Sequence, residues 1–149
     1  MPESPEESQS GEPIAQPRSI LLVEDNRTDV FVIKRVLEEC GLQGQVRVAS
    51  DGQEAVRYLQ GLAEDTTSPS PDLVLLDLNV PKIPGIEVLR HLRAGRCRHT
   101  PVIIVTSSVS EEDRKATEKL GAAAYFQKPN DLGAYMKLAY VIKRILAQH

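Results

Sequence analysis

The sequence predicts an α/β fold, a doubly wound three-layer sandwich in which helices cover both faces of a five-stranded parallel sheet of strand order 2-1-3-4-5. Short apolar runs alternate with stretches of helical periodicity, which is the pattern of repeated strand and helix units. The runs LLV, LVLL and VIIV are apolar without interruption, as in strands buried on both faces of a parallel sheet. Right-handed crossovers between such strands give a doubly wound sheet.

The first half of the chain contains two strands and two helices. They follow one another in the order SILLV, a helix over 28–40, QVRVA and a helix over 52–62. QVRVA alternates between apolar and polar residues, so we expect this strand at an edge of the sheet. Gly41 ends the first helix, and Asp51-Gly52 opens the second.

The second half begins after a polar loop over 61–71. Its elements are DLVLL, the turn VPKIPG, a helix over 86–94, PVIIV, a helix over 111–120, AAYFQ and a final helix from Asp131. Pro84-Gly85 opens the helix over 86–94. Ser110 is followed directly by three acidic residues, which is typical of an N-cap and the first turn of a helix.

Residues 1–18 differ in composition from the rest of the chain. They are rich in Pro, Glu and Ser and have almost nothing to bury, which predicts a disordered acidic arm. Residues 19–149 suit one compact domain, because 41% of the 149 residues are hydrophobic.

Charge and hydropathy exclude several classes of partner. The formal net charge of -3 comes from the arm, because residues 19–149 hold 17 acidic and 17 basic residues, so the folded part has no electrostatic footprint for nucleic acid. The chain has no basic, apolar leader and no run approaching ~18 apolar residues, so we expect no membrane association. Cys40 and Cys97 lack C-x-x-C spacing and are interpreted as reduced thiols, which favours a cytoplasmic location.

Polar residues follow four of the expected strands where each strand ends: Glu24-Asp25, Asp77, Thr106 and Lys128. The carboxyl ends of parallel strands meet at one edge of the sheet, where ligands bind in this architecture. Carboxylates gathered there repel one another unless a cation is present, and Mg²⁺ or Mn²⁺ prefers such oxygen ligands. The set therefore offers a metal site, a carboxylate nucleophile and groups that neutralise a phosphoryl group.

Each of these residues also has an ordinary structural interpretation. Glu24-Asp25 could serve only the N-terminus of the following helix, and Thr106 could be a strand residue or a cap. An isolated Lys128 would be a solvated surface charge. Their shared position favours a site, and Pro129 fixes a turn that would aim the Lys128 ammonium at the carboxylates.

The segments VEDN, LLDLNVPKIPG, VIIVTSS and AYFQKP have the order and spacing of the receiver domain of two-component response regulators, which the sequence closely resembles over Ser19–Leu146. The resemblance implies a flavodoxin-like receiver sandwich. It also implies that Asp77 is the phosphoacceptor for a phosphohistidine of a sensor histidine kinase. Asp25, Asp77 and the backbone carbonyl of Asn79 would coordinate Mg²⁺, and Glu24, where the family more often has Asp, would act through water.

The same resemblance implies roles for the remaining residues. Lys128 would pair with the carboxylate and then with phosphoryl oxygens, and the Thr106 hydroxyl would bond a phosphoryl oxygen. Thr106 and Tyr125 would form the conformational switch. Asn79 and Ser108 would tune the lifetime of the phosphorylated state, which would end by slow self-dephosphorylation.

Signal output is expected through protein contact or a phosphorelay, because no effector domain follows the matched segment. The loop over 61–71 and the segments NVPKIPG and RHTPVI are similar to stand-alone regulators paired with phytochrome-type photosensor kinases. A basic stretch that contains Arg90, Arg93, Arg96 and Arg98 is expected to be a solvated face.

The last helix has an apolar surface wider than one core stripe requires. Its members are Tyr135, Leu138, Ala139, Val141, Ile142, Ile145 and Leu146. The two interpretations are deeper burial within the domain and a homodimer or partner surface, and we favour the homodimer.

Other functions fit part of the pattern. Phosphatases of the haloacid-dehalogenase type also use Asp, Thr or Ser, Lys and Mg²⁺, but their D-x-D motif lies on the first strand, whereas Asp77 follows the third. A flavodoxin-like flavin carrier needs a phosphate-binding first loop, which Glu24-Asp25 would repel. A pseudo-receiver that is never phosphorylated is disfavoured by the intact acids, Thr106 and Lys128.

Overall fold

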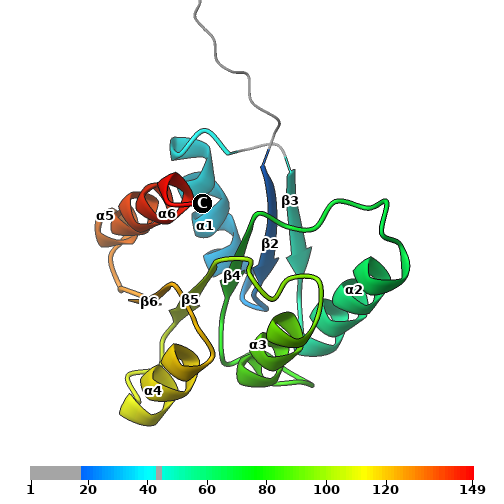
Figure 1. Cartoon of the computed structure of the whole chain (residues 1–149). Coiled ribbons are helices and arrows are strands. Elements are labelled where there is room, and N and C mark those ends of the chain that lie inside the picture. The colour runs from blue at the N-terminus through cyan, green and yellow to red at the C-terminus, as the bar shows by residue number, and fades with distance from the viewer. Residues whose placement is uncertain (1–17, 43–44) are drawn as a thin grey trace, which may run out of the picture.

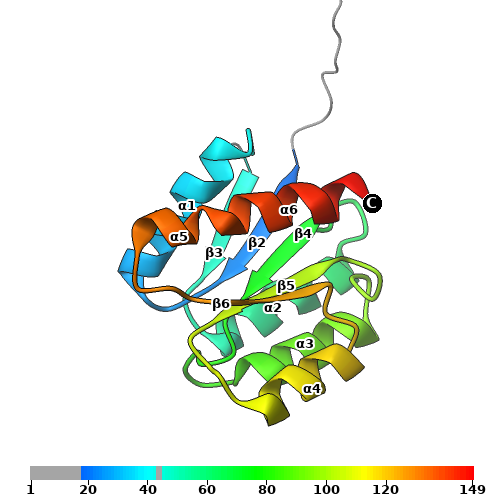
Figure 2. The same cartoon turned by 90° about the vertical axis from the view of Figure 1, so that its left-hand side faces the viewer.

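The computed structural model describes residues 18–42 and 45–149, and five parallel strands lie there between two layers of helices (Figures 1 and 2). The strands are β2 (Ser19–Val23), β3 (Gln45–Ala49), β4 (Leu73–Leu76), β5 (Val102–Thr106) and β6 (Ala124–Gln127). Their order in the sheet is β3-β2-β4-β5-β6, which confirms the predicted order 2-1-3-4-5. β3 is an edge strand, as its alternating sequence predicts.

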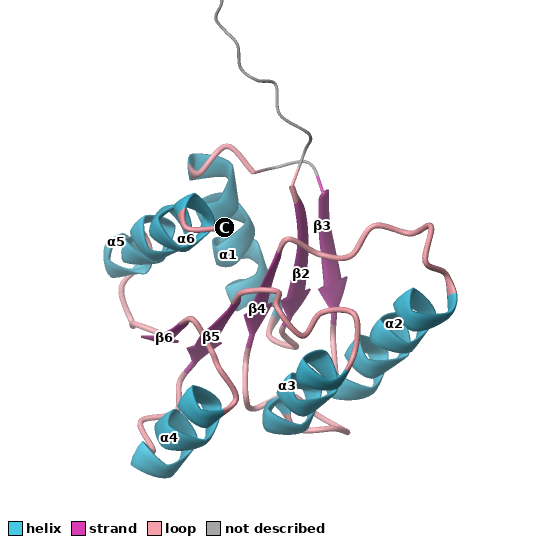
Figure 3. Cartoon of the chain, in the orientation of Figure 1, coloured by secondary structure: helices cyan, strands magenta, loops and turns pink. Residues whose placement is uncertain are grey.

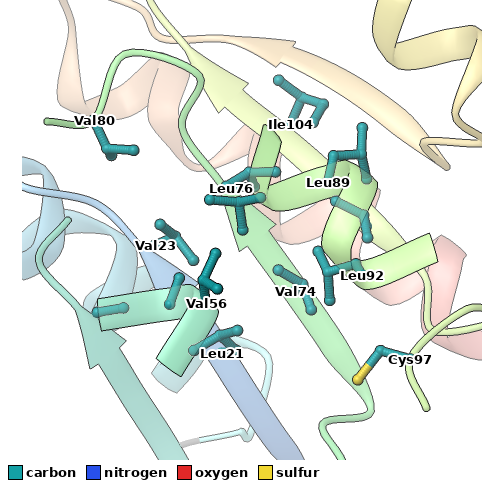
Figure 4. Close-up of a cluster of buried hydrophobic side chains, with 14 of the residues drawn as sticks. Leu21, Val23, Val56, Val74, Leu76, Val80, Leu89, Leu92, Cys97 and Ile104 are labelled. Atoms are coloured by element: carbon teal, nitrogen blue, oxygen red, sulfur yellow. The ribbon is translucent and has the colours of Figure 1, made fainter. Parts of the chain in front are cut away.

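Helices occupy both faces of this sheet (Figure 3). They are α1 (Arg27–Glu39), α2 (Gly52–Glu64), α3 (Gly85–Ala94), α4 (Glu111–Lys119), α5 (Leu132–Tyr135) and α6 (Lys137–Ala147). Figure 2 shows α1, α5 and α6 on one face and α2, α3 and α4 on the other. Each face has its own apolar core, and Figure 4 shows the one in which Leu21, Val74 and Leu76 from the strands meet Val56 and Leu89 from the helices.

Helix N-termini are capped by the side chains that the sequence suggests. Ser110 accepts a hydrogen bond from the Asp113 backbone N–H at 3.2 Å, and Asp51 accepts one from the Glu54 N–H at 2.7 Å. The helix α1 starts one residue earlier than predicted because Asn26 caps it. The helix α2 continues past its predicted end at residue 62, as far as Glu64.

The final helix is divided, which differs from the single helix predicted from Asp131. The backbone N–H of Met136 donates to the carbonyl of Gly133 at 3.2 Å, so the chain makes a tighter turn there than in an α-helix. Met136 has φ −67° and ψ −14°. The four-residue α5 therefore ends at Tyr135, and α6 begins at Lys137.

The wide apolar surface of the last helix lies inside the domain, which is the alternative we did not favour. Six of its seven side chains are buried and Val141 is partly buried, because α6 packs on the sheet and beside α1. On α6 itself, Tyr140 is the large apolar side chain that stays exposed, at 77%. The width of the stripe therefore gives no reason to expect a homodimer.

The prediction of a solvated basic face is wrong for Arg93, which is partly buried, and incomplete for Arg96, which is exposed but also donates to backbone carbonyls. Arg93 donates to the carbonyls of Leu120 at 2.7 Å and Thr100 at 2.9 Å, among others. Arg96 donates to the carbonyls of Leu62 at 2.8 Å and Ser68 at 2.9 Å, which holds the loop that follows α2. These side chains satisfy backbone acceptors that charge counting along the sequence does not reveal.

Two further predictions concern other parts of the chain. The disordered arm predicted for residues 1–18 lies outside the described residues except for Arg18. Cys40 and Cys97 are both free thiols, and burial raises the pKa of each. Within the described ranges, none of the helices combines the length and apolar character needed to cross a membrane.

Candidate functional site

The backbone of the sheet brings the polar residues after four strands to one edge. The N–H of Asp77 donates to the Val23 carbonyl at 3.0 Å, so the chain after β4 lies beside the end of β2. The N–H of Lys128 donates to the Thr106 carbonyl at 2.8 Å, which joins the ends of β5 and β6. The parallel hydrogen-bond ladders thus continue one residue past the strands, and they fix the backbone positions of Asp77 and Lys128.

The ammonium group of Lys128 lies among three carboxylates. Its Nζ is 2.8 Å from Asp77 Oδ2, 2.8 Å from Glu24 Oε1 and 2.9 Å from Asp29 Oδ2. An ammonium group has three N–H donors, so each has an acidic neighbour. The side chain is only 9% exposed. Burial disfavours the charge, but contacts with the carboxylates of Asp77, Glu24 and Asp29 outweigh it and raise the pKa of Lys128.

Glu24 is the most deeply buried acid of the site, with 1% of its surface exposed. Burial, and next the charge of Asp77, raise its pKa to about 7 against the opposing effect of Lys128. One oxygen, Oε2, accepts a hydrogen bond from the Asn26 N–H at 3.1 Å. The other, Oε1, is in ion-pair contact with Lys128 but has no hydrogen-bond partner of good geometry in the described part of the chain.

Three of the acids fit a divalent cation. Carboxylate oxygens of Glu24, Asp25 and Asp77 lie within 4.8 Å of one another. Asp25 is exposed, so the cluster opens to water on its side. The single Lys128 cannot neutralise four carboxylates, and Glu24 Oε1 is a buried acceptor that a metal-bound water would satisfy. Hard oxygen ligands of this kind suit Mg²⁺ or Mn²⁺.

The chain after β4 is held close to Asp77 by two features. The N–H of Asn79 donates to Asp77 Oδ1 at 3.1 Å, which fixes the carboxylate oxygen that does not contact Lys128. Gly85, at the start of α3, packs on the backbone of Asp77 and Leu78. A Cβ atom at position 85 would lie 2.3 Å from the Asp77 carbonyl oxygen, so only glycine fits there.

Thr106 and Tyr125 are linked through one loop. Thr106 is fully buried, and its Oγ1 accepts hydrogen bonds from the Ser108 N–H at 3.3 Å and, at 3.5 Å, from Asn79 Nδ2. The Tyr125 hydroxyl donates to the Ser108 carbonyl at 3.1 Å. The guanidinium carbon of Arg114 lies 4.3 Å from the centre of the Tyr125 ring. Tyr125 is therefore coupled to the loop that begins at Thr106.

Sequence reasoning missed Asp29 and Tyr135. Asp29 lies in the first turn of α1, where an acid is ordinarily assigned to the helix dipole. Tyr135 belonged to an apolar stripe and gave no sign that its hydroxyl reaches the site. In the structure that hydroxyl donates to Asp29 Oδ1 at 3.2 Å.

The assembled groups can carry out one kind of chemistry well. Asp77 offers a carboxylate nucleophile, Lys128 a cation next to it, and Thr106 a hydroxyl on the neighbouring strand. A cation held by the acids would neutralise an arriving phosphoryl group, and phosphoryl transfer depends mainly on such positioning and charge neutralisation.

Comparison with known proteins agrees with this chemistry. Residues 20–139 match the family model of the response regulator receiver domain. The response regulator Rcp1 of Synechocystis sp. is 34% identical over 128 residues, which cover 85% of this chain and 87% of Rcp1.

Solved structures give the same picture. The phosphorylated cyanobacterial phytochrome response regulator RcpA superposes with a TM-score of 0.78 at 31% identity, over 89% of this chain and 95% of that one. The Mn²⁺-bound form of Rcp1 superposes with a TM-score of 0.75 at 34% identity, over 85% and 92%.

Proposed function

This chain belongs to the response regulator receiver domain family, and on that premise we propose that Asp77 accepts a phosphoryl group from a phosphohistidine of a sensor histidine kinase. The observation that carries the assignment to Asp77 is its position: a buried carboxylate between the Lys128 ammonium and two further acids that complete a cation site. Membership of the receiver domain family supports phosphoryl transfer in two-component signalling over a flavin carrier or a haloacid-dehalogenase-type phosphatase.

The transfer step forms a bond between an Asp77 carboxylate oxygen and phosphorus. The bond between phosphorus and the histidine nitrogen breaks, and that nitrogen keeps the electron pair. Lys128 pairs with Asp77 before the step and then with a phosphoryl oxygen, and the Thr106 hydroxyl bonds another. Lys128 already contacts the Asp77 carboxylate, and Thr106 is linked to it through Asn79.

A divalent cation would be held by Asp25, Asp77 and the Asn79 backbone carbonyl, with Glu24 acting through water. When bound, Mg²⁺ or Mn²⁺ supplies positive charge to the phosphoryl oxygens. The buried Glu24 Oε1, which lacks a well-formed hydrogen bond from the described residues, supports its assignment to a water-mediated contact. The relative Rcp1 has been solved with Mn²⁺ bound.

We assign to Asn79 and Ser108 the control of how long the phosphoryl group stays on Asp77. Both contact Thr106 Oγ1, and Asn79 also contacts the Asp77 carboxylate. We assign the slow self-dephosphorylation to attack by water on the acyl phosphate, at a rate that the residues at positions 79 and 108 would tune.

The switch runs from Thr106 to Tyr125. When Thr106 turns toward the phosphoryl group, the loop at Ser108 moves with it, and Ser108 holds the Tyr125 hydroxyl. The Arg114 contact with the Tyr125 ring then carries the change to α4. A signal thus reaches the surface of α4 and β6 through contacts that already exist, by a shift between two states.

The partner we propose is a phytochrome-like sensor kinase in the cytoplasm, because RcpA, at 31% identity, is a phytochrome response regulator. An effector protein or a phosphorelay would receive the signal. Along the predicted last helix, from Asp131 on, the large exposed apolar side chains are Leu132, Met136 and Tyr140, whereas the wide stripe on which the homodimer was predicted is buried, so we do not expect the output to depend on a homodimer.

Intact mass after incubation with acetyl phosphate and Mg²⁺ tests the proposal. Wild-type protein should gain one phosphoryl group, and a chelator should prevent it. Asp77→Asn should gain none. Asp72→Asn is the matched control, because it makes the same change at the opposite end of β4, where Asp72 is exposed and accepts from the Ser19 N–H.

Two results would overturn the assignment to Asp77. One is a phosphoryl group on Asp77→Asn, and the other is no phosphoryl group on wild type with either acetyl phosphate or a purified phytochrome-type kinase. Turnover of p-nitrophenyl phosphate should be undetectable, and steady turnover would identify a phosphatase instead.

A further inference from the structure

A fourth carboxylate belongs to the Lys128 environment but not to the cation cluster. Asp29 Oδ2 lies 2.9 Å from Lys128 Nζ and comes from α1, whereas the other two acids in contact with Nζ follow strands. Glu24 and Asp77 are both members of the group that could hold a cation, and Asp29 is not. Three described acids contact Lys128. Of these, Asp29 is the one whose carboxylate a bound cation would not share with the Lys128 ammonium.

Asp29 is itself oriented by a second buried group. The Tyr135 hydroxyl donates to its other oxygen, Oδ1, at 3.2 Å. Tyr135 is 3% exposed, and its ring lies 5.9 Å from the ring of Phe126, centre to centre. Burial, and next the charge of Asp29, raise the pKa of Tyr135, so its hydroxyl stays protonated and remains a donor. Each oxygen of Asp29 thus has a fixed partner.

The helix dipole alone does not explain this arrangement. An acid in the first turn of α1 gains from the dipole wherever its side chain points. Asp29 instead points between two groups that lie far from it in sequence, Lys128 after β6 and Tyr135 on α5. Such convergence is what a residue that positions another side chain requires.

We propose that Asp29, held by Tyr135, is the positioning residue for Lys128, and keeps its ammonium beside Asp77 when the cation and the phosphoryl group engage the other acids. The Lys128 ammonium has three N–H donors. A bound cation would engage the carboxylates of Glu24 and Asp77, so fewer of their oxygens would remain to accept from the Lys128 ammonium. The bond to Asp29 then fixes its direction. This inference rests on the proposed function only for its consequence in phosphorylation.

The first test needs no phosphorylation. The ¹H–¹⁵N signal of the Lys128 ammonium, assigned by its loss in Lys128→Met, is recorded without and with Mg²⁺. In wild type the signal should persist when Mg²⁺ is added, because Asp29 still protects the ammonium from exchange with water. In Asp29→Asn it should broaden or disappear on addition of Mg²⁺. An identical signal in Asp29→Asn and wild type would overturn the proposal.

The second test separates positioning from charge. At saturating Mg²⁺ the maximal rate of phosphorylation by acetyl phosphate should fall about tenfold in Asp29→Asn, the order expected for one hydrogen bond to a charged group. The Mg²⁺ concentration at half-maximal rate should change less than about twofold, because Asp29 is not a ligand. A shift in that concentration without a change in maximal rate would show that Asp29 acts only through its charge, which would overturn the positioning role.

Two further variants test the role of Tyr135 and control for the loss of charge. Tyr135→Phe keeps the ring and the net charge and removes only the hydroxyl, so it should reduce the maximal rate by about threefold and weaken the ammonium signal. Glu39→Gln removes the same charge as Asp29→Asn from the exposed far end of α1 and should change neither readout. If Tyr135→Phe behaves as wild type in both, the orienting role of Tyr135 is wrong. If wild type is not phosphorylated at all, the proposed function fails, but the ammonium signal still decides the role of Asp29.

Discussion

Two cationic side chains lie at opposite ends of the sheet, Lys128 at the carboxyl edge and Arg93 near the amino ends of β5 and β6, and they differ in what surrounds them. Lys128 contacts three carboxylates. Arg93 donates instead to backbone carbonyls, namely those of Cys97, Arg98, Thr100, Leu120 and Gly121. Carboxylates can take up a proton at ordinary pH or form a new covalent bond to phosphorus, whereas a backbone carbonyl that already accepts a hydrogen bond from Arg93 does neither. The surroundings of Lys128 therefore suit a reaction, and those of Arg93 suit a structural role.

The chemistry of the two side chains matches this division. Arginine has five N–H donors in a rigid planar fork, which suits the several carbonyls that Arg93 reaches in the turns after α3 and α4. Lysine has a compact charge with three donors on a flexible chain, so it can follow an acceptor from Asp77 to a phosphoryl oxygen. Substitutions of Lys128 and of Arg93 should therefore damage different properties, phosphorylation in the first case and stability in the second.

Lys128→Met should produce the largest change in function. The rate of phosphorylation by acetyl phosphate should fall about a hundredfold or more, because the neutral side chain cannot compensate charge on the phosphoryl oxygens. The metal-free protein should also lose stability, since the acids then lack their ammonium partner, and Mg²⁺ should restore most of that loss. Initial rates by intact mass and urea unfolding with and without Mg²⁺ measure both. Phosphorylation of Lys128→Met at the wild-type rate would show that the Lys128 ammonium is not needed for phosphoryl transfer.

Arg93→Met should have the opposite profile. The free energy of unfolding should fall by about 2 to 3 kcal/mol, because several partly buried carbonyls lose their donor at once. Mg²⁺ should recover none of this difference, and folded protein should be phosphorylated within about twofold of the wild-type rate. Arg98→Met is the control, since the Arg98 side chain is exposed and its substitution should be nearly neutral in urea unfolding. A loss at position 98 as large as at 93 would mean that charge, and not carbonyl contact, is what matters there.

The pH dependence of stability also distinguishes the two regions, since the carboxyl edge contains an acid, Glu24, whose pKa is shifted to near neutrality. Glu24 has a pKa of about 7 in the folded state against an ordinary value of 4.5, so the folded state binds this proton more tightly than the unfolded chain does. The stability of the metal-free protein should therefore fall as pH rises from about 4.5 to about 7, on the order of 2 kcal/mol, and level off above that.

Urea unfolding in chelator between pH 5 and pH 8 measures this slope. Glu24→Gln should flatten it, because the group that titrates is gone. In wild type, Mg²⁺ should restore stability most at pH 8, where Glu24 is ionised. The same slope in Glu24→Gln as in wild type would assign the pH dependence to another group.

The sequence predicted the layers, the strand order and the edge position of β3, because buried parallel strands and caps such as Ser110 are local signals. It also brought Glu24, Asp77 and Lys128 together, since strand ends of a doubly wound sheet converge. Asp29 could not be predicted in the same way. Its role depends on the direction of a side chain at the start of α1 and on the Tyr135 hydroxyl 106 residues away.

The misjudged features share a physical cause. The apolar surface of α6 was too wide for one stripe, but the sequence cannot tell whether the extra width faces the sheet, a neighbouring helix or solvent. Arg93 and Arg96 resembled solvated charges, because the carbonyls that accept from them lie in turns whose geometry is set by tertiary structure. Every residue has a backbone carbonyl, so the residue types in a sequence do not show which carbonyls need a donor from a side chain.

Asp77→Asn should give the smallest effect, a gain of about 1 kcal/mol in the stability of the metal-free protein at pH 8. The amide oxygen can still accept from Lys128, whereas the like charge that raises the pKa of Glu24 is removed. The gain should shrink toward pH 5, where Glu24 is protonated and repulsion with position 77 is already relieved. Asp72→Asn, at the other end of β4, should show no such pH dependence because position 72 lies outside the acid cluster. A lower melting temperature for Asp77→Asn in chelator would mean that the ion pair with Lys128 outweighs the repulsion among the acids, and that the carboxyl edge, like the surroundings of Arg93, is built for stability.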